Sequence, residues 1–293
     1  MLSGIIIIDK PEGFTSHDVV GKLRGILHER RIGHGGTLDP MATGVLPVFV
    51  GRATRAAEYC ERSEKEYIAG LRLGIVTDTQ DTTGNILQEK TADISEEKLK
   101  NTLSGFIGHQ MQIPPMYSAV KINGKKLYEL ARQGTEVERK PREIEIKKLE
   151  YMGKDENGDA VLDIVCSKGT YIRTLCNDIG EKLGCGGAMS SLRRVKAAGY
   201  CEAEAISLDE VAELFGMGQT DRFLRPVDSM FSKYESDTVP DEHAEKQVRN
   251  GGGYKSDRPA GKYRVYGKNG EFLMLGVCDG SFMRTEKSFF EVV

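Results

Sequence analysis

The chain has 293 residues, enough for one large domain or for one domain with a small addition. Lys and Arg total 41 against 44 for Asp and Glu, and this net charge of -3 excludes a uniformly basic nucleic-acid-binding protein. Any site for a polyanion must therefore be local. No apolar run approaches the roughly 18 residues of a membrane helix, and the first residues lack the pattern of a signal peptide. We expect a cytoplasmic protein that does not enter a membrane.

The six cysteines are scattered, without a C-x-x-C pair and without histidines at zinc-ligand spacing. They predict reduced, mostly buried thiols and no metal site. Tryptophan is absent, so stacking on a nucleic-acid base would fall to Tyr, Phe, His or Arg.

The first elements follow clear local signals. The β-branched run at residues 5–8 predicts a buried strand. Residues 15–18 fit a helix-capping pattern and precede apolar residues at helical spacing, which predicts a helix ending near Arg31. Residues 33–44 contain four glycines and one proline, so they predict a loop.

The middle of the chain mixes strands and helices without regular alternation, which favours an α+β fold over a doubly wound parallel sheet. The predicted strands cover residues 45–50, 67–73, 117–122, 144–151 and 161–165. The predicted helices cover residues 95–106, 126–132, 171–183 and 207–215.

The last part of the chain predicts a small β-rich module. Residues 221–236 lack periodicity and could form a linker, so we place a domain boundary near Asp237 and expect domains at 1–236 and 237–293. An Asn269-Gly270 turn predicts a hairpin, with strands at 263–265, 272–277 and 289–293.

Charge is unevenly distributed along the chain. Residues 22–31 carry four basic residues and one acid, whereas residues 202–228 carry seven acids and two arginines. The first segment is the better candidate for a polyanion surface, although ordinary solvated surface explains both.

One carboxylate in the glycine-rich loop stands out. Asp39 directly precedes Pro40, which restricts its backbone to extended geometry and so fixes its direction. Composition alone favours a simple turn-forming role for Asp39. His34 could contact a phosphate or a base, or could be satisfied by nearby backbone.

Residues 33–47 closely resemble the signature of the tRNA pseudouridine(55) synthase family, of the bacterial stand-alone type. Six further blocks resemble the family in family order, so the resemblance covers roughly the first 230 residues. These blocks are Ile8-Asp9-Lys10-Pro11 with Thr15-Ser16, Lys65-Glu66-Tyr67, Thr77-Asp78-Thr79 with Asp81 and Gly84, Pro114-Pro115-Met116-Tyr117-Ser118-Ala119-Val120-Lys121, Gly169-Thr170-Tyr171-Ile172-Arg173 and Leu192-Arg193-Arg194.

The resemblance implies a mixed, mainly antiparallel central sheet flanked by helices. It also implies an isomerase that converts uridine 55 in the T-arm loop of tRNA to pseudouridine. The enzyme would flip the base out, break the N1–C1′ bond, turn the base and rejoin it through C5. This chemistry needs no cofactor and no metal, but it does need an ionised carboxylate in a pocket that excludes water.

By the same resemblance Asp39 is that carboxylate, acting either as a nucleophile or as a base. A carboxylate in a closed site needs a nearby cation to stay ionised, and Arg173 is the candidate. Tyr67 would stack on the target base and assist proton removal from C5, and Leu192 would line the pocket. Arg173, Tyr67 and Leu192 each also have an ordinary structural interpretation. For Tyr171 we prefer core packing.

The remaining implied contacts involve RNA. His34 would brace the space that the flipped base leaves. Lys10, Arg30, Arg31 and Lys121 would hold phosphates without reading bases, although Lys10 could instead support the catalytic loop from within.

Two features qualify the resemblance. Most relatives carry threonine where this chain has Gly35, which would add backbone freedom to the loop. The tail from about Asp241 loosely resembles the RNA-binding PUA domain, with a merely structural cap as the alternative.

The leading hypothesis is therefore a monomeric enzyme that acts on the T-arm stem-loop of tRNA without an obligate protein partner. A second hypothesis keeps the fold but makes the chain a subunit directed by a guide RNA. A third is a tRNA-binding or folding factor without chemistry. A metal-dependent hydrolase ranks last, because the five histidines form no ligand pattern.

Overall fold

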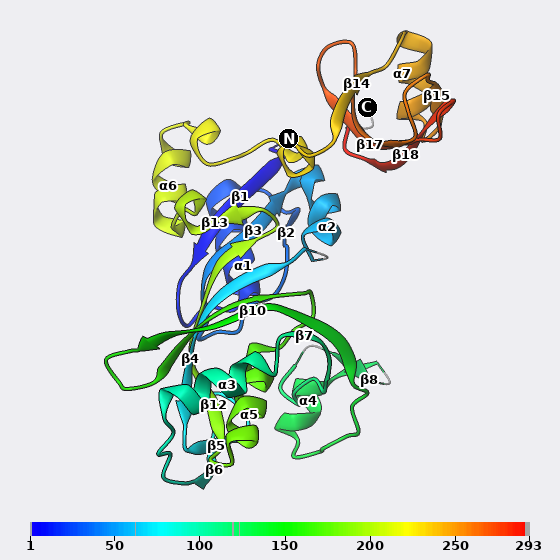
Figure 1. The fold of residues 1–293 in the computed structure, drawn as a ribbon. Coiled ribbons are helices and arrows are strands. Elements are labelled where there is room, and N and C mark those ends of the chain that lie inside the picture. The colour runs from blue at the N-terminus through cyan, green and yellow to red at the C-terminus, as the bar shows by residue number, and fades with distance from the viewer. Residues whose placement is uncertain (1, 62, 119, 123, 291–293) are drawn as a thin grey trace.

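The computed structural model describes residues 2–61, 63–118, 120–122 and 124–290. Nine strands of this described part form one large sheet (Figure 1), in which only the β3–β12 pair is parallel. The order is β1 (Gly4–Lys10), β3 (Thr43–Val50), β12 (Gly187–Ala197), β4 (Lys65–Leu73), β11 (Ala160–Cys166), β10 (Arg142–Lys154) and β7 (Gly108–Gln112), with β2 (Ile32–His34) on β3 and β13 (Tyr200–Cys201) on β12. The predicted mixed, mainly antiparallel sheet is confirmed.

Helices cover the two halves of this sheet separately. In the first half, α1 and α6 pack on β1 and β3 through one apolar core. In the second half, α3 and α5 pack on β10 and β12 through another. The helices are α1 (Ser16–Leu27), α2 (Ala57–Glu61), α3 (Glu96–Ser104), α4 (Leu127–Arg132), α5 (Ile172–Leu183) and α6 (Leu208–Gly216), and the 3-10 segments are η1 (Gly51–Ala56), η2 (Glu202–Glu204), η3 (Thr220–Arg222) and η4 (Val227–Phe231).

Two small hairpins extend from the second half: β5 (Ile75–Thr77) pairs with β6 (Ile86–Glu89), and β8 (Lys121–Ile122) pairs with β9 (Lys125–Lys126). The strand predicted at 117–122 is wrong except for β8. The carbonyl oxygen of Tyr117 accepts a hydrogen bond from Arg173 rather than from a neighbouring strand. The first helix also ends earlier than Arg31, because His28 adopts a left-handed conformation with φ 52° directly after Leu27.

A second sheet of five strands forms the C-terminal part, at one end of the molecule in Figure 1. Its strands are β14 (Glu235–Thr238), β16 (Gly261–Tyr266), β17 (Phe272–Cys278), β18 (Phe282–Ser288) and β15 (Gly253–Lys255), and α7 (Glu242–Arg249) packs on them. Neither α7 nor β18 was predicted from the sequence. Of the strand predicted at 289–293, Phe289 and Phe290 follow β18 without joining a strand, and the rest lies outside the described residues.

The two parts meet through an aromatic cluster. Phe231 of η4 contacts the rings of Tyr59, Phe272 and Phe289. Phe272 and Phe289 belong to the same apolar core as residues of β1 and β3, so the second sheet is attached to the first by buried surface as well as by the chain.

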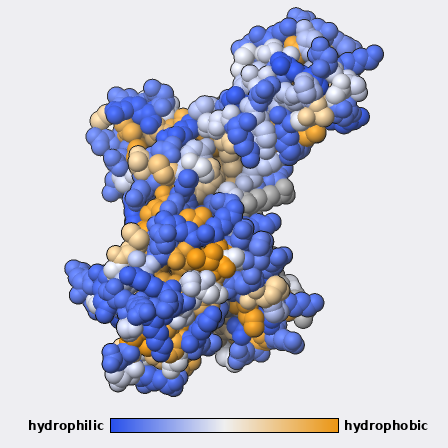
Figure 2. All heavy atoms as spheres, in the orientation of Figure 1, coloured by the Kyte–Doolittle hydropathy of each residue, from blue (hydrophilic) through white to orange (hydrophobic). Residues whose placement is uncertain are grey.

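In the face that Figure 2 shows, hydrophobic residues gather in the middle, near the level of β10 in Figure 1, with hydrophilic residues around them. No helix of the described residues is long and apolar enough to span a membrane.

Candidate active site

The loop that carries Asp39 connects β2 to β3 and is anchored from the β1–α1 connection. The Leu38 amide donates to Ser16 Oγ (2.9 Å), and the Gly13 amide donates to the Pro40 carbonyl (2.8 Å). The Ala42 amide closes a turn on the carbonyl of Asp39 itself (3.0 Å). These bonds fix the backbone on both sides of the aspartate, as its position before proline predicted.

Lys10 contributes to this anchoring from inside the protein. Its ammonium group is fully buried and donates to the carbonyl oxygens of Pro11 (2.8 Å) and Pro40 (3.2 Å) and to that of Phe14. Burial lowers the pKa of Lys10 to about 8. The phosphate contact expected for Lys10 is therefore wrong, because the group is covered by protein, and the structure agrees with the alternative that it supports the loop.

Asp39 is paired with Arg173, the second residue of α5. Arg173 Nη2 donates to Asp39 Oδ1 (3.2 Å), and Arg173 Nε lies 2.9 Å from Asp39 Oδ2. The arginine side chain is only 6% exposed, whereas 34% of the aspartate side chain is exposed. The cation is thus covered by protein, while the carboxylate keeps one open side that a ligand can reach.

A second carboxylate, Asp81, lies on the other side of Arg173, with its Oδ2 3.7 Å from Arg173 Nη1. Asp81 is nearly buried and accepts hydrogen bonds from Thr79 Oγ1 (2.8 Å) and from the amide and hydroxyl of Thr83. Arg173 also donates to the carbonyl oxygen of Thr79 (3.1 Å). The guanidinium is therefore held in one orientation by both carboxylates and by backbone.

The balance of burial and charge sets the protonation of Asp39. Burial raises the pKa of Asp39 above the ordinary value of an aspartate, and Arg173 opposes this shift. Asp81 adds to the upward shift, because it is a second negative charge nearby. We expected Arg173 to keep Asp39 ionised, and it does favour that form, although burial is the larger effect.

Tyr67 and Leu192 come from neighbouring strands of the central sheet. Tyr67 lies on β4 and Leu192 on β12, and both side chains are nearly buried in the same apolar core as Leu38, next to Asp39 in the chain. Burial raises the pKa of Tyr67, and the negative charge of Asp39 adds to this shift, so the two groups lie within electrostatic reach. The sheet thus places Tyr67 and Leu192 next to the loop that carries Asp39, which we call the catalytic loop.

His34 and Tyr171 lie at the edges of this group. His34 ends β2 just before the loop, half-buried, and its Nδ1 is buried without a hydrogen-bond partner in the described residues. Burial lowers the pKa of His34, which favours the neutral ring. Tyr171 caps α5 two residues before Arg173 and is half-buried, outside the described core clusters. Gln112 holds its backbone through two hydrogen bonds.

Of the other predicted RNA contacts, the structure describes the side chains of Arg30 and Arg31. Arg30 and Arg31 are exposed beyond the end of α1, where Arg31 Nε donates to Thr54 Oγ1 (3.0 Å) and Arg30 lines a shallow surface pocket with Arg24 and His28. Lys121 belongs to β8, but its side chain lies outside the described part of the structure.

The sequence led us to expect that Gly35 adds backbone freedom to the loop, but the structure shows a tightly held backbone there. Its amide donates to the Pro47 carbonyl (2.8 Å), and its carbonyl accepts from Cys60 Sγ (3.2 Å). A Cβ at this position would lie 2.5 Å from Cys60 Sγ and 2.9 Å from the ring of Phe49. The space of a side chain is thus already filled by α2 and β3, which hold the backbone tightly.

Two residues of the site, Asp81 and Arg194, were not predicted from the sequence. Asp81 was visible only as part of the block at residues 77–84, and Arg194 only as part of the block at 192–194. Arg194 is buried and donates to the carbonyl oxygen of Gly36 in the catalytic loop (3.2 Å). Among the described residues, no three His, Cys, Asp or Glu side chains come together as metal ligands would.

The chain matches two family profiles in succession. Residues 24–172 match the N-terminal domain of the TruB family of pseudouridylate synthases, and residues 173–232 match a tRNA pseudouridylate synthase B C-terminal domain. Asp39 lies within the first match and Arg173 within the second.

Similar proteins extend the match over nearly the whole chain. The tRNA pseudouridine synthase B of Clostridium kluyveri is 42% identical over 94% of this chain and 96% of its own length. That of Alkaliphilus oremlandii is 44% identical over 85% and 82%. A solved Cbf5-Nop10-Gar1 complex contains a chain with a TM-score of 0.73 and 26% identity, covering 98% of this chain and 85% of that one. The chain therefore belongs to the TruB family of pseudouridylate synthases, which are enzymes.

Proposed function

We propose that this protein converts uridine 55 in the T-arm loop of tRNA to pseudouridine, acting as a monomer without a cofactor. The observation that carries the proposal is the exposed side of Asp39, an otherwise buried carboxylate aligned by a buried arginine. The names of the relatives support tRNA as the substrate, because proteins about 40% identical over nearly the full length are called tRNA pseudouridine synthase B.

The geometry supports a division of labour during the reaction. The target base leaves its stack and enters the site beside Tyr67 and Leu192. Asp39, in its ionised form, then assists cleavage of the N1–C1′ bond, as a nucleophile at the sugar or as a base. Arg173 favours that ionised form, and the nearly buried walls limit the access of water to the sugar. The base turns and C5 bonds to C1′, after which the proton on C5 is removed with the help of Tyr67.

His34 fits a brace for the vacated stack. It ends the strand that leads into the loop, and burial favours its neutral form, so it can stack under bases without a permanent charge. Arg30, Arg31 and Lys121 are proposed to hold phosphates outside the pocket. Tyr171 is proposed to line the site from the start of α5, where its backbone is fixed by Gln112.

We further propose that residues 1–236 form the catalytic domain and residues 237–293 a PUA-like RNA-binding module. The family matches end at residue 232, and the second sheet begins at Glu235, close to the proposed boundary. The aromatic cluster around Phe231 supports a fixed attachment of this module to the catalytic part.

The guide-RNA hypothesis has one observation in its favour, the likeness to a chain from a Cbf5-Nop10-Gar1 complex. That likeness has 26% identity, against 42% for the tRNA pseudouridine synthase B of Clostridium kluyveri. The stand-alone activity on tRNA is therefore the better supported of the two.

The test is to incubate the purified protein with a T-arm hairpin RNA in EDTA and to analyse the nucleosides. We expect pseudouridine at the target position, and none in a hairpin whose target uridine is replaced by cytidine. Activity that appears only when a guide RNA and further proteins are added would favour the guide-dependent subunit. Binding of the hairpin without any product under either condition would favour the factor without chemistry.

A further inference from the structure

Arg194 is a buried cation without an ion pair to any described carboxylate. Its side chain is 1% exposed and is among the largest fully buried side chains of the described structure. The neighbouring Arg193, by contrast, faces the surface and pairs with Asp9 and Glu202. Burying a guanidinium without an opposite charge is unfavourable, so the position of Arg194 calls for a partner that its surroundings at rest do not supply.

Backbone carbonyls hold Arg194 at the centre of the site. Its Nε donates to the carbonyl oxygen of Val45 (2.7 Å) and its Nη2 to that of Gly36 (3.2 Å). At Gly44, where β3 runs beside Arg194, a Cβ would lie 2.3 Å from the Arg194 carbonyl oxygen, so glycine allows this close approach. The guanidinium is therefore fixed between β3 and the catalytic loop.

The sheet places Arg194 directly opposite Tyr67. In the antiparallel pairing of β12 with β4, Arg194 is the partner of Tyr67, so the two side chains lie on the same face as neighbours. Arg194 lowers the pKa of Tyr67, so its guanidinium lies within electrostatic reach of the phenol. Lys10 and His34 also lie within electrostatic reach of Arg194, but neither is an anion. The nearby anion Asp39, which also acts on Tyr67 and Lys10, is paired with Arg173 instead.

We propose that Arg194 is a positioning residue for Tyr67 and stabilises the negative charge of the Tyr67 phenolate, which forms before Tyr67 takes the proton from C5. The proposal rests on the proposed function, and it explains why a buried arginine lacks a permanent acidic partner. The negative charge that Arg194 stabilises, that of the Tyr67 phenolate, exists only during the reaction.

The proton balance of this step is complete without a further reactant. The Tyr67 hydroxyl first passes its proton to N1 through water, which leaves a phenolate and a positively charged ring. The phenolate then takes the proton from C5, and the electron pair of the C–H bond returns to the ring. This step restores the Tyr67 hydroxyl and leaves neutral pseudouridine. The net change is the transfer of one proton from C5 to N1.

The groups that face Tyr67 come from three elements. Arg194 on β12 lowers the pKa of Tyr67, whereas Asp39 of the catalytic loop and Cys166 on β11 raise it. Burial also raises it and is the largest influence. Loss of Arg194 should therefore raise the pKa of Tyr67 further and reduce the phenolate available to accept the proton.

The test combines Arg194→Gln with 3,5-difluorotyrosine at position 67, whose phenol is more acidic than that of tyrosine. We expect Arg194→Gln to lower kcat by about 100-fold, within the usual range for a proton-transfer group, and to leave binding of the T-arm hairpin within about twofold. In the Arg194→Gln variant, 3,5-difluorotyrosine at position 67 should raise kcat at least about tenfold. In the native background it should change kcat less than about threefold. Arg193→Gln, on the exposed side of the same strand, is the matched control and should keep native kcat.

Arg194→Lys serves if the glutamine variant does not fold, because lysine keeps the buried charge and loses the fork of donors. We expect it to lower kcat by about tenfold, with the same rescue. Native kcat in both variants, or a loss that difluorotyrosine does not relieve, would overturn the proposal. If the native protein itself makes no pseudouridine, the proposed function fails. If it is active and the rescue is absent, only the role of Arg194 fails.

Discussion

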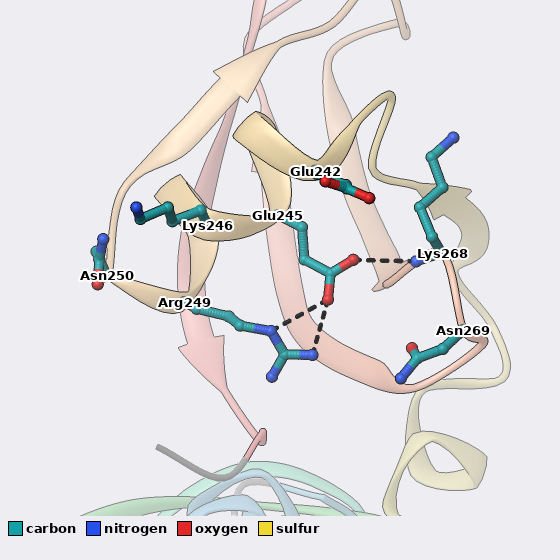
Figure 3. Close-up of a pocket in the computed structure, with 7 residues that line it drawn as sticks. All are labelled: Glu242, Glu245, Lys246, Arg249, Asn250, Lys268 and Asn269. Carbon is teal, nitrogen blue, oxygen red and sulfur yellow. Dashed lines mark hydrogen bonds and ion pairs between the residues drawn. The ribbon is translucent and has the colours of Figure 1, made fainter. Parts of the chain in front are cut away.

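Arg173 and Arg249 are each held between two carboxylates, and their surroundings differ. One lies in the central sheet region and the other in the C-terminal part, where α7 meets the turn between β16 and β17 (Figure 3). The sets are Arg173 with Asp39 and Asp81, and Arg249 with Glu245 and Glu271. Arg173 is 6% exposed and Arg249 is 29% exposed.

The two surroundings have opposite effects on the carboxylates. Burial raises the pKa of Asp39 in spite of Arg173, whereas the hydrogen bond with Arg249 lowers the pKa of Glu245. In the set with the more exposed arginine, called the exposed set below, hydrogen bonds from Arg249 and from the Lys268 amide outweigh the partial burial of Glu245. In the set around Arg173, called the buried set below, the arginine only partly replaces the water that Asp39 loses. The same residue types thus favour a neutral acid in one place and an ionised acid in the other.

The strongest test of this contrast is Asp39→Asn. The change keeps the shape of the side chain but removes the negative charge, so we expect pseudouridine formation to fall by about 10⁴-fold or more, as for other essential catalytic groups. Binding of a T-arm hairpin should stay within a few fold, since the site remains formed. Nucleoside analysis and filter binding give the two numbers. Retained activity would refute the role assigned to Asp39.

Asp81→Asn probes the second carboxylate of the buried set. The amide side chain of the variant would still accept hydrogen bonds from Thr79 and Thr83 but would no longer hold Arg173 by charge. Because a shift of about 1 Å in a catalytic group can lower the rate about 100-fold, we expect a loss of that order in kcat with little change in KM.

The matched control lies in the exposed set. Glu271→Gln removes the corresponding carboxylate beside Arg249, and it should leave kcat unchanged. Equal effects of Asp81→Asn and Glu271→Gln on kcat would show that the buried network has no special role in orienting Arg173.

The pH dependence of the reaction follows from the direction of the Asp39 shift. The proposed active form of Asp39 is the ionised one, so kcat/KM should rise with pH through the pKa of Asp39 in the free protein. Since burial raises that pKa, the acid limb should lie above the value of about 3.9 for an ordinary aspartate, with a tenfold loss per pH unit below it. Single-turnover rates below saturation, between pH 4 and 8, measure this limb. A rate that stays constant down to pH 4 would contradict the assignment.

Local signals in the sequence predicted the elements next to Asp39 well. The strand at 5–8 and the cap at Thr15 both depend on neighbouring residues, and both are present. The loop predicted at 33–44 is shorter, because residues 33–34 belong to β2 and residues 43–44 to β3. The pair of Asp39 and Arg173 was expected through the family resemblance, and the structure places the two side chains in contact.

The parts that the sequence did not predict depend on distant contacts. Strand β12 lies between β3 and β4 and carries polar residues such as Arg193 and Arg194, so its pattern is not that of a buried strand. The role of Asp81 arises only when the chain brings it to Arg173, 92 positions away in sequence. Two roles stayed open for Lys10 at the level of the sequence, because its buried partners are carbonyl groups, which leave no trace in the sequence.

The smallest effect is expected for Glu245→Gln in the exposed set. Glu245 accepts from Arg249 and from the amide of Lys268, so it joins α7 to the turn. The pKa of Glu245 is lowered, so its stabilisation is present above the unfolded pKa and is lost as pH falls through the folded pKa. We expect the variant to lose less than about 1 kcal/mol of unfolding free energy at pH 7. The loss should shrink towards zero in acid.

Thermal unfolding of the native protein and of Glu245→Gln at pH 7 and pH 3 measures this change, with pseudouridine formation at pH 7 expected to stay at the native level. Glu242→Gln is the control, since Glu242 borders the same pocket but makes no ion pair with a described residue (Figure 3). A loss that persists at pH 3 would mean that Glu245 acts through packing rather than charge. A loss of activity would mean that the C-terminal connection reaches the catalytic loop, against the separation of roles inferred from the two arginines.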